Sequence, residues 1–224
     1  MSERIRIAID GSSAVSGLLE TPPSPLACYV FGHGAGAGME HPFMTRVALS
    51  LAERGIATLR YQFPYMERGT RRPDAPKVAH AVVRAAVAAA AQRQPRLPLL
   101  AGGKSFGARM TSQAQAASPL PGVAGLLFFG FPLHPAGRPS IDRAQHLADV
   151  KVPMLFVQGT RDELADAGLI EPTVEALRGV ATLHWVPNGD HSLHVPVKSG
   201  RTDAQVLDSA LDAVRDWVER VLGR

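Results

Sequence analysis

Three residue types that together perform nucleophilic catalysis follow one another along the chain as Ser105, Asp162 and His191. A serine hydroxyl is a poor nucleophile until a base takes its proton and a third group orients that base. Ser105 is the candidate nucleophile, His191 the candidate base and Asp162 the acid that would hold the histidine. The sequence therefore predicts an acyl-transfer site, provided that the fold brings these side chains together.

Ser105 stands at the centre of a Gly-x-Ser-x-Gly pattern that it forms with Gly103 and Gly107. The apolar run at residues 97–101 predicts a short strand before the pattern, and a helix is expected to begin directly after Ser105. Such a turn lifts the serine hydroxyl above the edge of the sheet. Glycine suits both flanking positions because a Cβ there would collide with the closely packed strand and helix.

A second glycine-rich segment, residues 32–38, follows another apolar strand and contains four glycines. Without side chains, its backbone N–H groups can face a ligand. We expect the N–H groups of Ala35 and Phe106 to form an oxyanion hole, with Gly34 beside the substrate. For His33 the sequence leaves three roles open: a substrate ligand, a catalytic base, or a brace of its own loop.

Two nucleotide-binding patterns share some of these residues. Gly-Lys-Ser at residues 103–105 resembles the end of a P-loop, but Pro98 occupies the position of the earlier glycine that a P-loop requires. The segment 32–38 fits a loose dinucleotide-binding pattern, but the strand expected at residues 56–61 lacks the acidic residue that holds a ribose. Both patterns are therefore disfavoured, and no cofactor is expected.

Other residues compete for the acid and base positions. Asp190 and Asp166 are alternative acids, but Asp162 directly follows a strand in a Gly-x-x-Asp turn. His194 is the alternative base to His191, which lies immediately after an Asn-Gly-Asp turn. The two histidines could also bind zinc, but no further ligand pattern converges on them, so no metal is expected.

The remaining candidate substrate contacts are Phe63, Met66 and Lys104. Phe63 and Met66 belong to a loop expected to overhang the sheet edge, either as pocket wall or as packing. Lys104 precedes the nucleophile, and its cation either attracts anionic substrates or points to solvent. The basic loop at residues 68–72 is interpreted as a solvated loop or an anion-binding rim, because no nucleic-acid motif accompanies it.

Alternating strand and helix patterns predict an α/β fold, with a mostly parallel sheet and helices on both faces, in one domain spanning residues 1–224. Strands are expected at residues 5–9, 15–19, 26–31, 56–61, 97–101, 123–129, 152–158 and 182–186. Helices are expected at residues 43–54, 77–93, 106–117, 141–149, 172–178 and 204–222, with Pro172 in the first turn of its helix. Ligands bind such sheets at the carboxyl ends of the strands, where all the candidate catalytic residues lie.

Composition narrows the classes of protein that the chain can be. Of its 224 residues 46% are hydrophobic and 20% charged, which excludes a disordered chain. The net charge of +4 is spread along the sequence, so no nucleic-acid partner is expected. The single cysteine, Cys28, allows no intrachain disulfide and is interpreted as a core residue. No signal peptide or membrane-spanning run is recognisable, which predicts a cytoplasmic protein with no membrane contact; the oligomeric state is left open.

Taken together, these motifs resemble the α/β-hydrolase superfamily, at residues 33–36, 103–107, 159–162 and 189–192. Residues 63–67 with 71–73, and 102–105 followed by Arg109, are similar to its compact branch of small hydrolases, close in shape to dienelactone hydrolases. The resemblance implies little or no cap and a serine-histidine-aspartate triad, but no particular substrate. From the four motifs and their order we expect a serine hydrolase that acts on a small ester, thioester or related acyl compound. Dienelactone hydrolases use a cysteine nucleophile, so their activity does not carry over to Ser105. The alternative is a catalytically silent binding or scaffold module on the same fold.

Overall fold

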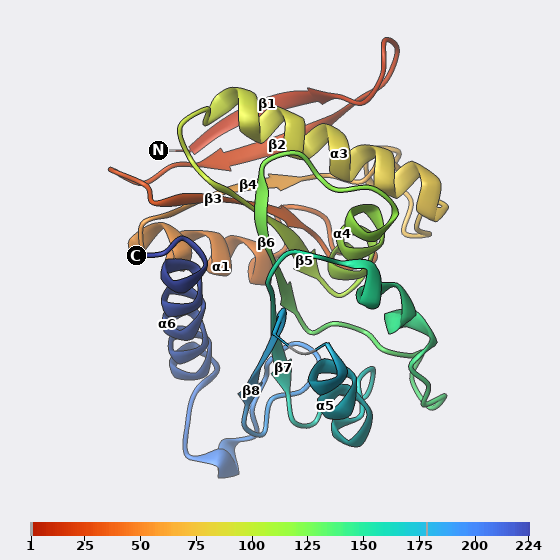
Figure 1. Cartoon of the computed structure of the whole chain (residues 1–224), viewed down its shortest axis with the longest axis vertical. Helices are drawn as coiled ribbons and strands as arrows, with labels where there is room; N and C mark the ends of the chain where they lie inside the picture. The colour runs from red at the N-terminus through yellow and green to blue at the C-terminus, as the bar shows by residue number, and fades with distance from the viewer. Residues whose placement is uncertain (1, 178) are drawn as a thin grey trace.

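A computed structural model describes residues 2–177 and 179–224 of the chain. In these residues, eight strands form one sheet in the order β1-β2-β4-β3-β5-β6-β7-β8 (Figure 1). Their bounds are β1 Ser2–Ala8, β2 Ala14–Glu20, β3 Ala27–Gly32, β4 Ile56–Tyr61, β5 Leu99–Lys104, β6 Val123–Phe129, β7 Met154–Gly159 and β8 Ala181–Val186. Strand β2 runs antiparallel to both of its neighbours, β1 and β4, and the other adjacent pairs are parallel. The predicted mostly parallel α/β sheet is confirmed.

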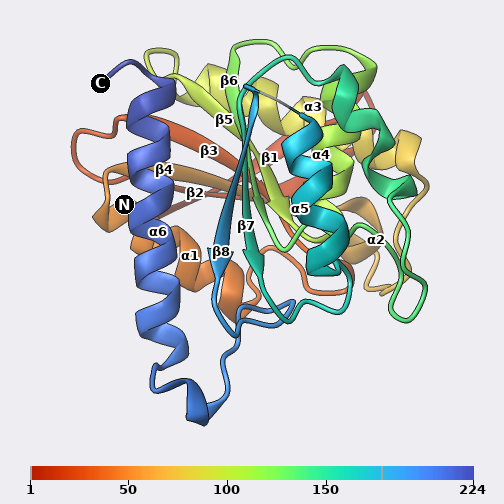
Figure 2. The same ribbon diagram turned by 60° about the horizontal axis from the view of Figure 1, so that its bottom comes forward.

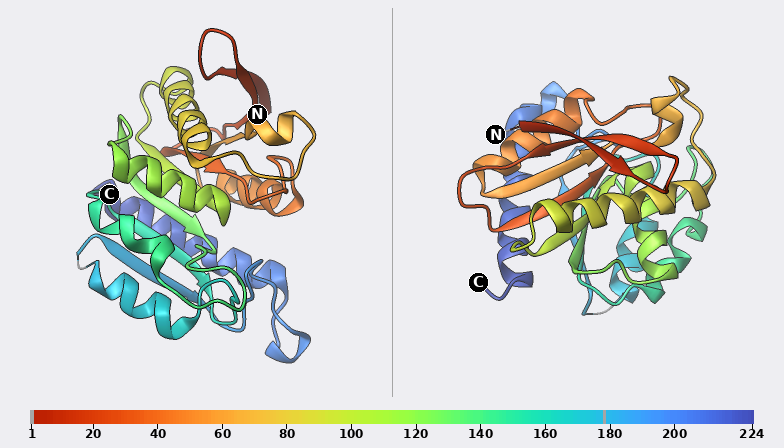
Figure 3. Two further views of the ribbon diagram at one scale, coloured as in Figure 1. Left: turned by 90° about the vertical axis from the view of Figure 1, so that its right-hand side faces the viewer. Right: turned by 90° about the horizontal axis from the view of Figure 1, so that it is seen from above.

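Helices cover both faces of this sheet, as Figures 2 and 3 show. Helices α1 (Pro42–Glu53) and α6 (Asp203–Val221) pack on one face, and α3 (Pro76–Arg93), α4 (Phe106–Ala117) and α5 (Ala167–Ala176) on the other. Shorter helical turns are α2 (Pro64–Glu67), η1 (Asp142–Asp149) and η2 (Val197–Ser199). None of the helices in the described ranges is long and apolar enough to cross a membrane.

The position of each strand in the sheet determines how deeply it is buried. Every residue of β3, β4, β5 and β7 is buried, because helices cover both of their faces. At one edge, β1 buries only Ile5 and Ile7; at the other, β8 buries only Val186. The strand that leads to Ser105 therefore lies in the rigid centre of the sheet, whereas β8 forms a partly exposed edge.

Most predicted elements begin and end within three residues of the observed bounds, but α5 does not. It begins at Ala167 rather than at Pro172, because the Asp166 carboxylate caps the helix by accepting the N–H of Gly168 at 2.9 Å. Pro172 consequently lies inside the helix instead of in its first turn. The predicted end of this helix, Arg178, lies outside the described residues.

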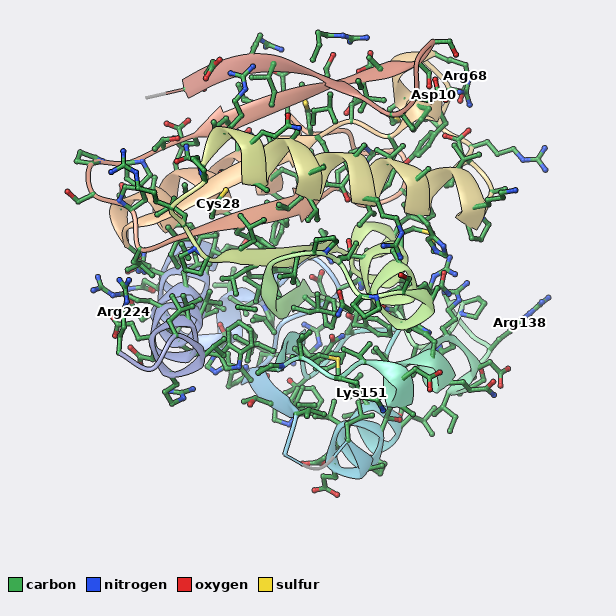
Figure 4. The ribbon with its side chains drawn as sticks, turned by 45° about the horizontal axis from the view of Figure 1, so that its top comes forward. Asp10, Cys28, Arg68, Arg138, Lys151 and Arg224 are labelled. Carbon is green, nitrogen blue, oxygen red and sulfur yellow. The ribbon has the colours of Figure 1, made fainter. Side chains whose placement is uncertain are left out.

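Figure 4 labels Cys28, which the sequence predicts in the core, and Arg68 of the basic loop, whose role the sequence left open. Cys28 lies fully buried in the core cluster that α3 covers, and burial raises the pKa of its thiol to about 12. The thiol therefore stays protonated and serves as packing. Arg68, in the predicted basic loop, is exposed and forms an ion pair with Asp74 at 2.5 Å. The loop is thus solvated at this position.

Candidate active site

The turn at Ser105 joins the end of β5 to the start of α4. Its backbone has a φ of 52° and a ψ of −108°, a conformation that costs a non-glycine residue about 1–3 kcal/mol. The surroundings hold it there, since the N–H of Ser105 donates to the carbonyl of Phe129 at 3.1 Å. A Cβ on Gly103 would lie 2.5 Å from the carbonyl oxygen of Gly32, and one on Gly107 would overlap the same carbonyl group. The two flanking glycines are therefore required by close packing, as predicted.

The carboxyl ends of β5, β7 and β8 bring Ser105, Asp162 and His191 together. These strands are aligned by parallel pairing through β6, and the arrowheads of β7 and β8 point to this common edge in Figure 2. His191 Nε2 lies 2.9 Å from Ser105 Oγ, and His191 Nδ1 lies 2.8 Å from Asp162 Oδ2. Because a carboxylate only accepts, Nδ1 carries the proton and Nε2 is left to accept from the serine hydroxyl.

The Asp162 carboxylate is completely buried and bonded on several sides. Its Oδ1 accepts the N–H of Leu164 at 2.8 Å, and its Oδ2 accepts from Gln158 Nε2 at 2.6 Å. Gln158 is itself fixed, because its Oε1 accepts the N–H of Phe131 at 2.9 Å. The sequence analysis missed Gln158, although a polar residue near the end of an otherwise apolar strand was a visible signal.

The competing acids and base have other partners. The Asp190 carboxylate accepts the N–H groups of Ser192 and His194 at 2.7 and 2.9 Å, and Asp166 caps α5. His194 Nδ1 lies 2.8 Å from Asp203. Across the described parts of the chain, no three His, Cys, Asp or Glu side chains gather as metal ligands do.

The glycine-rich loop lies directly beside Ser105. The carbonyl of His33 accepts the N–H of Gly107 at 3.1 Å, which fixes the start of the loop to the start of α4. A Cβ on Gly34 would lie 3.8 Å from the Cβ of Ser105. Within the described chain, the N–H groups of Ala35 and Phe106 donate no hydrogen bond to another residue. They are free to donate to an atom held near Ser105.

Among the three roles considered for His33, the geometry fits the brace. Its imidazole is fully buried, and its Nε2 accepts the N–H of Phe63 at 3.1 Å, so Nδ1 carries a proton and donates to the carbonyl of Gly34 at 2.7 Å. Burial is the main cause that lowers the pKa of His33 to about 4, against an opposing contribution from the bond to Gly34. His33 is therefore a neutral side chain whose two hydrogen bonds fix the glycine-rich loop to the segment after β4.

This buried histidine predicts that stability falls in mild acid. An unfolded histidine titrates near 6.5, so between pH 6.5 and about 4 the unfolded chain binds a proton that folded His33 resists. The free energy of unfolding should decrease by up to about 1.4 kcal/mol for each pH unit lost in this window. Urea unfolding of the wild type and of His33→Gln, measured from pH 7 to 4, should give a shallower pH slope for the variant; equal slopes would contradict this account.

A cavity of about 530 Å³ opens in front of Ser105 and His191. Among the predicted substrate contacts, Gly34 and Lys104 line it, whereas His33, Phe63 and Met66 are not among the described residues of its wall. For these three residues the geometry fits the alternatives of packing and of a loop brace, because β4 leads into the short helix α2. There Phe63 is fully buried and packs edge-on against His33, with ring centroids 4.9 Å apart, and Met66 packs against the same core.

The cavity wall includes residues that the sequence analysis missed. They come from the N-cap and first turns of α1, from α6 and from the loops after β7 and β8: His41, Pro42, Phe43, Met44, Arg46, Leu164, Leu193, Asp203 and Leu207. One signal could have identified the wall residues at the start of α1. Since α1 follows the glycine-rich loop directly, its first turn must border the same edge of the sheet.

The chain matches a known protein family and is similar in fold to several solved structures. Residues 25–219 match the model of a family described as an alpha/beta hydrolase domain. A dienelactone hydrolase from Anabaena variabilis is similar, with a TM-score of 0.76 and 19% identity, covering 98% of this chain and 97% of that one. A lidless a/b serine hydrolase from Xanthomonas campestris has a TM-score of 0.73 and 22% identity, covering 96% and 94%.

Est1E from Butyrivibrio proteoclasticus, solved with bound ferulic acid, has a TM-score of 0.76 and 16% identity, covering 98% of this chain and 100% of that one. The similarity to these three structures thus extends over nearly the full length of each. Identities this low establish a shared fold, and the family match spans most of the chain. This chain belongs to the alpha/beta hydrolase family, and its fold is similar to those of a dienelactone hydrolase and of a serine hydrolase without a lid.

Proposed function

We propose that this chain is a serine hydrolase that cleaves a small ester, thioester or related acyl compound, with Ser105 as nucleophile. The observation that carries the proposal is the continuous set of hydrogen bonds from Ser105 Oγ through His191 to Asp162, at 2.9 and 2.8 Å. Nucleophile, base and orienting acid at hydrogen-bond distance are what serine activation requires.

The proposed reaction begins when Ser105 Oγ attacks the carbonyl carbon of the substrate while His191 Nε2 accepts its proton. The negative charge that develops on the carbonyl oxygen is stabilised by the N–H groups of Phe106 and Ala35. Such a donor typically contributes a factor of about 10² to 10³ in kcat. His191 then gives its proton to the leaving group, and water, activated by the same histidine, releases the acyl group from Ser105.

The cavity supports a small acyl substrate. Its volume of about 530 Å³ is within the range of small-molecule sites, and Phe43, Leu193 and Leu207 give it apolar surface. Related structures are described as a dienelactone hydrolase and a serine hydrolase, which agrees with cleavage of an ester bond. Dienelactone itself is not proposed as the substrate, because Ser105 stands where those enzymes carry a cysteine.

A fluorophosphonate probe tests the proposal directly. An activated serine displaces fluoride from phosphorus, so we expect one probe per chain on the peptide that contains Ser105. The Ser105→Ala variant should not be labelled. The matched Ser118→Ala variant, which changes an exposed serine at the far end of α4, should be labelled as the wild type is. An unlabelled wild-type protein, or labelling that persists in Ser105→Ala, would contradict the proposal and favour a catalytically silent module.

A further inference from the structure

Lys104, the residue before the nucleophile, is a buried cation without a counter-ion. The residue is only 9% exposed. The ammonium donates a hydrogen bond to the backbone carbonyl of His191. Among the ion pairs of the described residues, none includes Lys104. An ammonium has three N–H donors, so this contact leaves two of them without a protein partner.

The ammonium lies beside the catalytic histidine, in the wall of the cavity. A Cβ on Gly130 would lie 2.5 Å from Lys104 Nζ and 3.3 Å from His191 Cε1, which places both atoms against the same small space. The ring of Phe43 flanks the ammonium from α1, with its centroid 5.8 Å from Nζ. Lys104, Ser105 and His191 all line the cavity. The free N–H donors are therefore within reach of a ligand positioned for attack by Ser105.

The charges around the cavity favour an anion. Asp162 and Asp190 attract the ammonium, yet burial outweighs them and lowers the pKa of Lys104 to about 8. On the facing side, Arg46 of α1 adds a positive charge to the wall, and His41, the N-cap residue of this helix, lines the wall beside it. Asp203 of α6 is already paired with His194 at 2.8 Å. A buried ion without a partner is costly, and an anion bound at Lys104 would supply the missing partner.

We propose that Lys104 binds a carboxylate of the substrate, so that the site selects esters that carry a carboxylate close to the scissile bond. This inference rests on the proposed serine hydrolase function and specifies its substrate class. The carboxylate accepts from the ammonium and takes no part in bond making or breaking. Lys104 is a specificity-determining residue in this account, and the acyl transfer remains the work of Ser105 and His191.

Matched pairs of esters test the preference from both sides of the scissile bond. Monoethyl and diethyl glutarate differ by an acyl-side carboxylate, and the butyrate esters of glycolic acid and of methyl glycolate differ by one on the leaving group. In at least one pair, kcat/KM should favour the carboxylate by about 10- to 100-fold, as expected for a hydrogen bond between charged groups. Lys104→Met should bring this ratio close to one. The matched Lys151→Met variant, at an exposed lysine before β7, should keep it.

The pH dependence of the ratio gives a second, independent measurement. Both esters of a pair react through the same catalytic groups, so the ratio of their kcat/KM values isolates the charge of Lys104. Because the ammonium loses its proton above pH 8, the wild-type preference should be about five- to ninefold smaller at pH 9 than at pH 7. In Lys104→Arg, the guanidinium stays charged and the preference should persist at pH 9.

Binding to the Ser105→Ala variant separates this inference from the proposed function. Titration calorimetry with monoethyl and diethyl glutarate needs no turnover, and the monoester should bind at least about tenfold more tightly. If Lys104→Met instead slows both esters of a pair equally, the lysine only supports the His191 loop, and the inference is overturned. Absence of any carboxylate preference, in kinetics and in binding, overturns it as well. A protein that binds the monoester selectively but hydrolyses nothing contradicts the proposed function alone.

Discussion

Replacing Ser105 with alanine is expected to lower kcat on short-chain esters by about 10⁶-fold while the fold remains intact. The variant loses the oxygen that would form the acyl-enzyme, and His191 has no nucleophile left to deprotonate. The backbone bond from residue 105 to the carbonyl of Phe129 is retained, and the side-chain oxygen bonds only to His191 among the described residues. Steady-state kinetics and thermal unfolding, measured on the same preparation, check both parts of the expectation.

The Ser118→Ala variant is the control for this experiment. It makes the same chemical change on the same helix, at the exposed end remote from the cavity. Its kcat should remain within about twofold of wild type, as for most surface substitutions. A loss of less than about tenfold in Ser105→Ala would mean that another group acts as nucleophile, and the proposed mechanism would have to be abandoned.

Replacing Asp162 with asparagine is expected to lower kcat by about 10⁴-fold. The amide keeps the shape of the side chain but presents an N–H₂ group where Asp162 Oδ2 now accepts from His191 Nδ1 and Gln158 Nε2. A histidine facing an N–H donor moves its proton to Nε2, which can then no longer accept from Ser105. Kinetics should show the loss, and ¹⁵N NMR of the imidazole should show the change of tautomer.

The matched control is Asp190→Asn, since Asp190 is the nearest alternative acid in the sequence. Its Oδ1 accepts the N–H groups of Ser192 and His194, and an asparagine oxygen accepts the same two bonds. We therefore expect less than a tenfold loss of kcat for this variant. Equal losses in the two variants would show that Asp162 has no special role in orienting His191.

The elements that carry these residues could be predicted from local sequence. Apolar strands that end in glycine or in a polar turn have a strong pattern, and parallel strands must present their carboxyl ends at one edge. This reasoning placed Ser105, Asp162 and His191 at a common edge, and the structure brings them within hydrogen-bond distance. The observed strand order explains the short distances, because only β6 lies between β5, which leads to Ser105, and β7, which leads to Asp162.

The burial of several candidate site residues and the start of α5 could not be predicted, because they depend on contacts that are not visible in a local sequence pattern. His33 and Phe63 stand at the ends of strands that point toward the site, but each side chain is buried by the other and by α2. Lysine is usually a surface residue, so its type did not predict burial at position 104. Lys104 is buried because the loop that carries His191 and the ring of Phe43 pack against its ammonium. Pro172 was expected to mark a helix start, whereas the Asp166 cap moved that start five residues earlier.

The partly exposed edge strand β8 has a consequence for how the protein loses activity. Ser105 extends from the fully buried centre of the sheet, but His191 is attached to the strand with the fewest buried residues on that side. Local opening of such an edge requires less free energy than unfolding of the whole domain. Under mild denaturing conditions His191, the proposed base, would therefore separate from Ser105, the proposed nucleophile, while most of the fold survives. The fraction of active molecules is then governed by the stability of one edge, not by that of the entire protein.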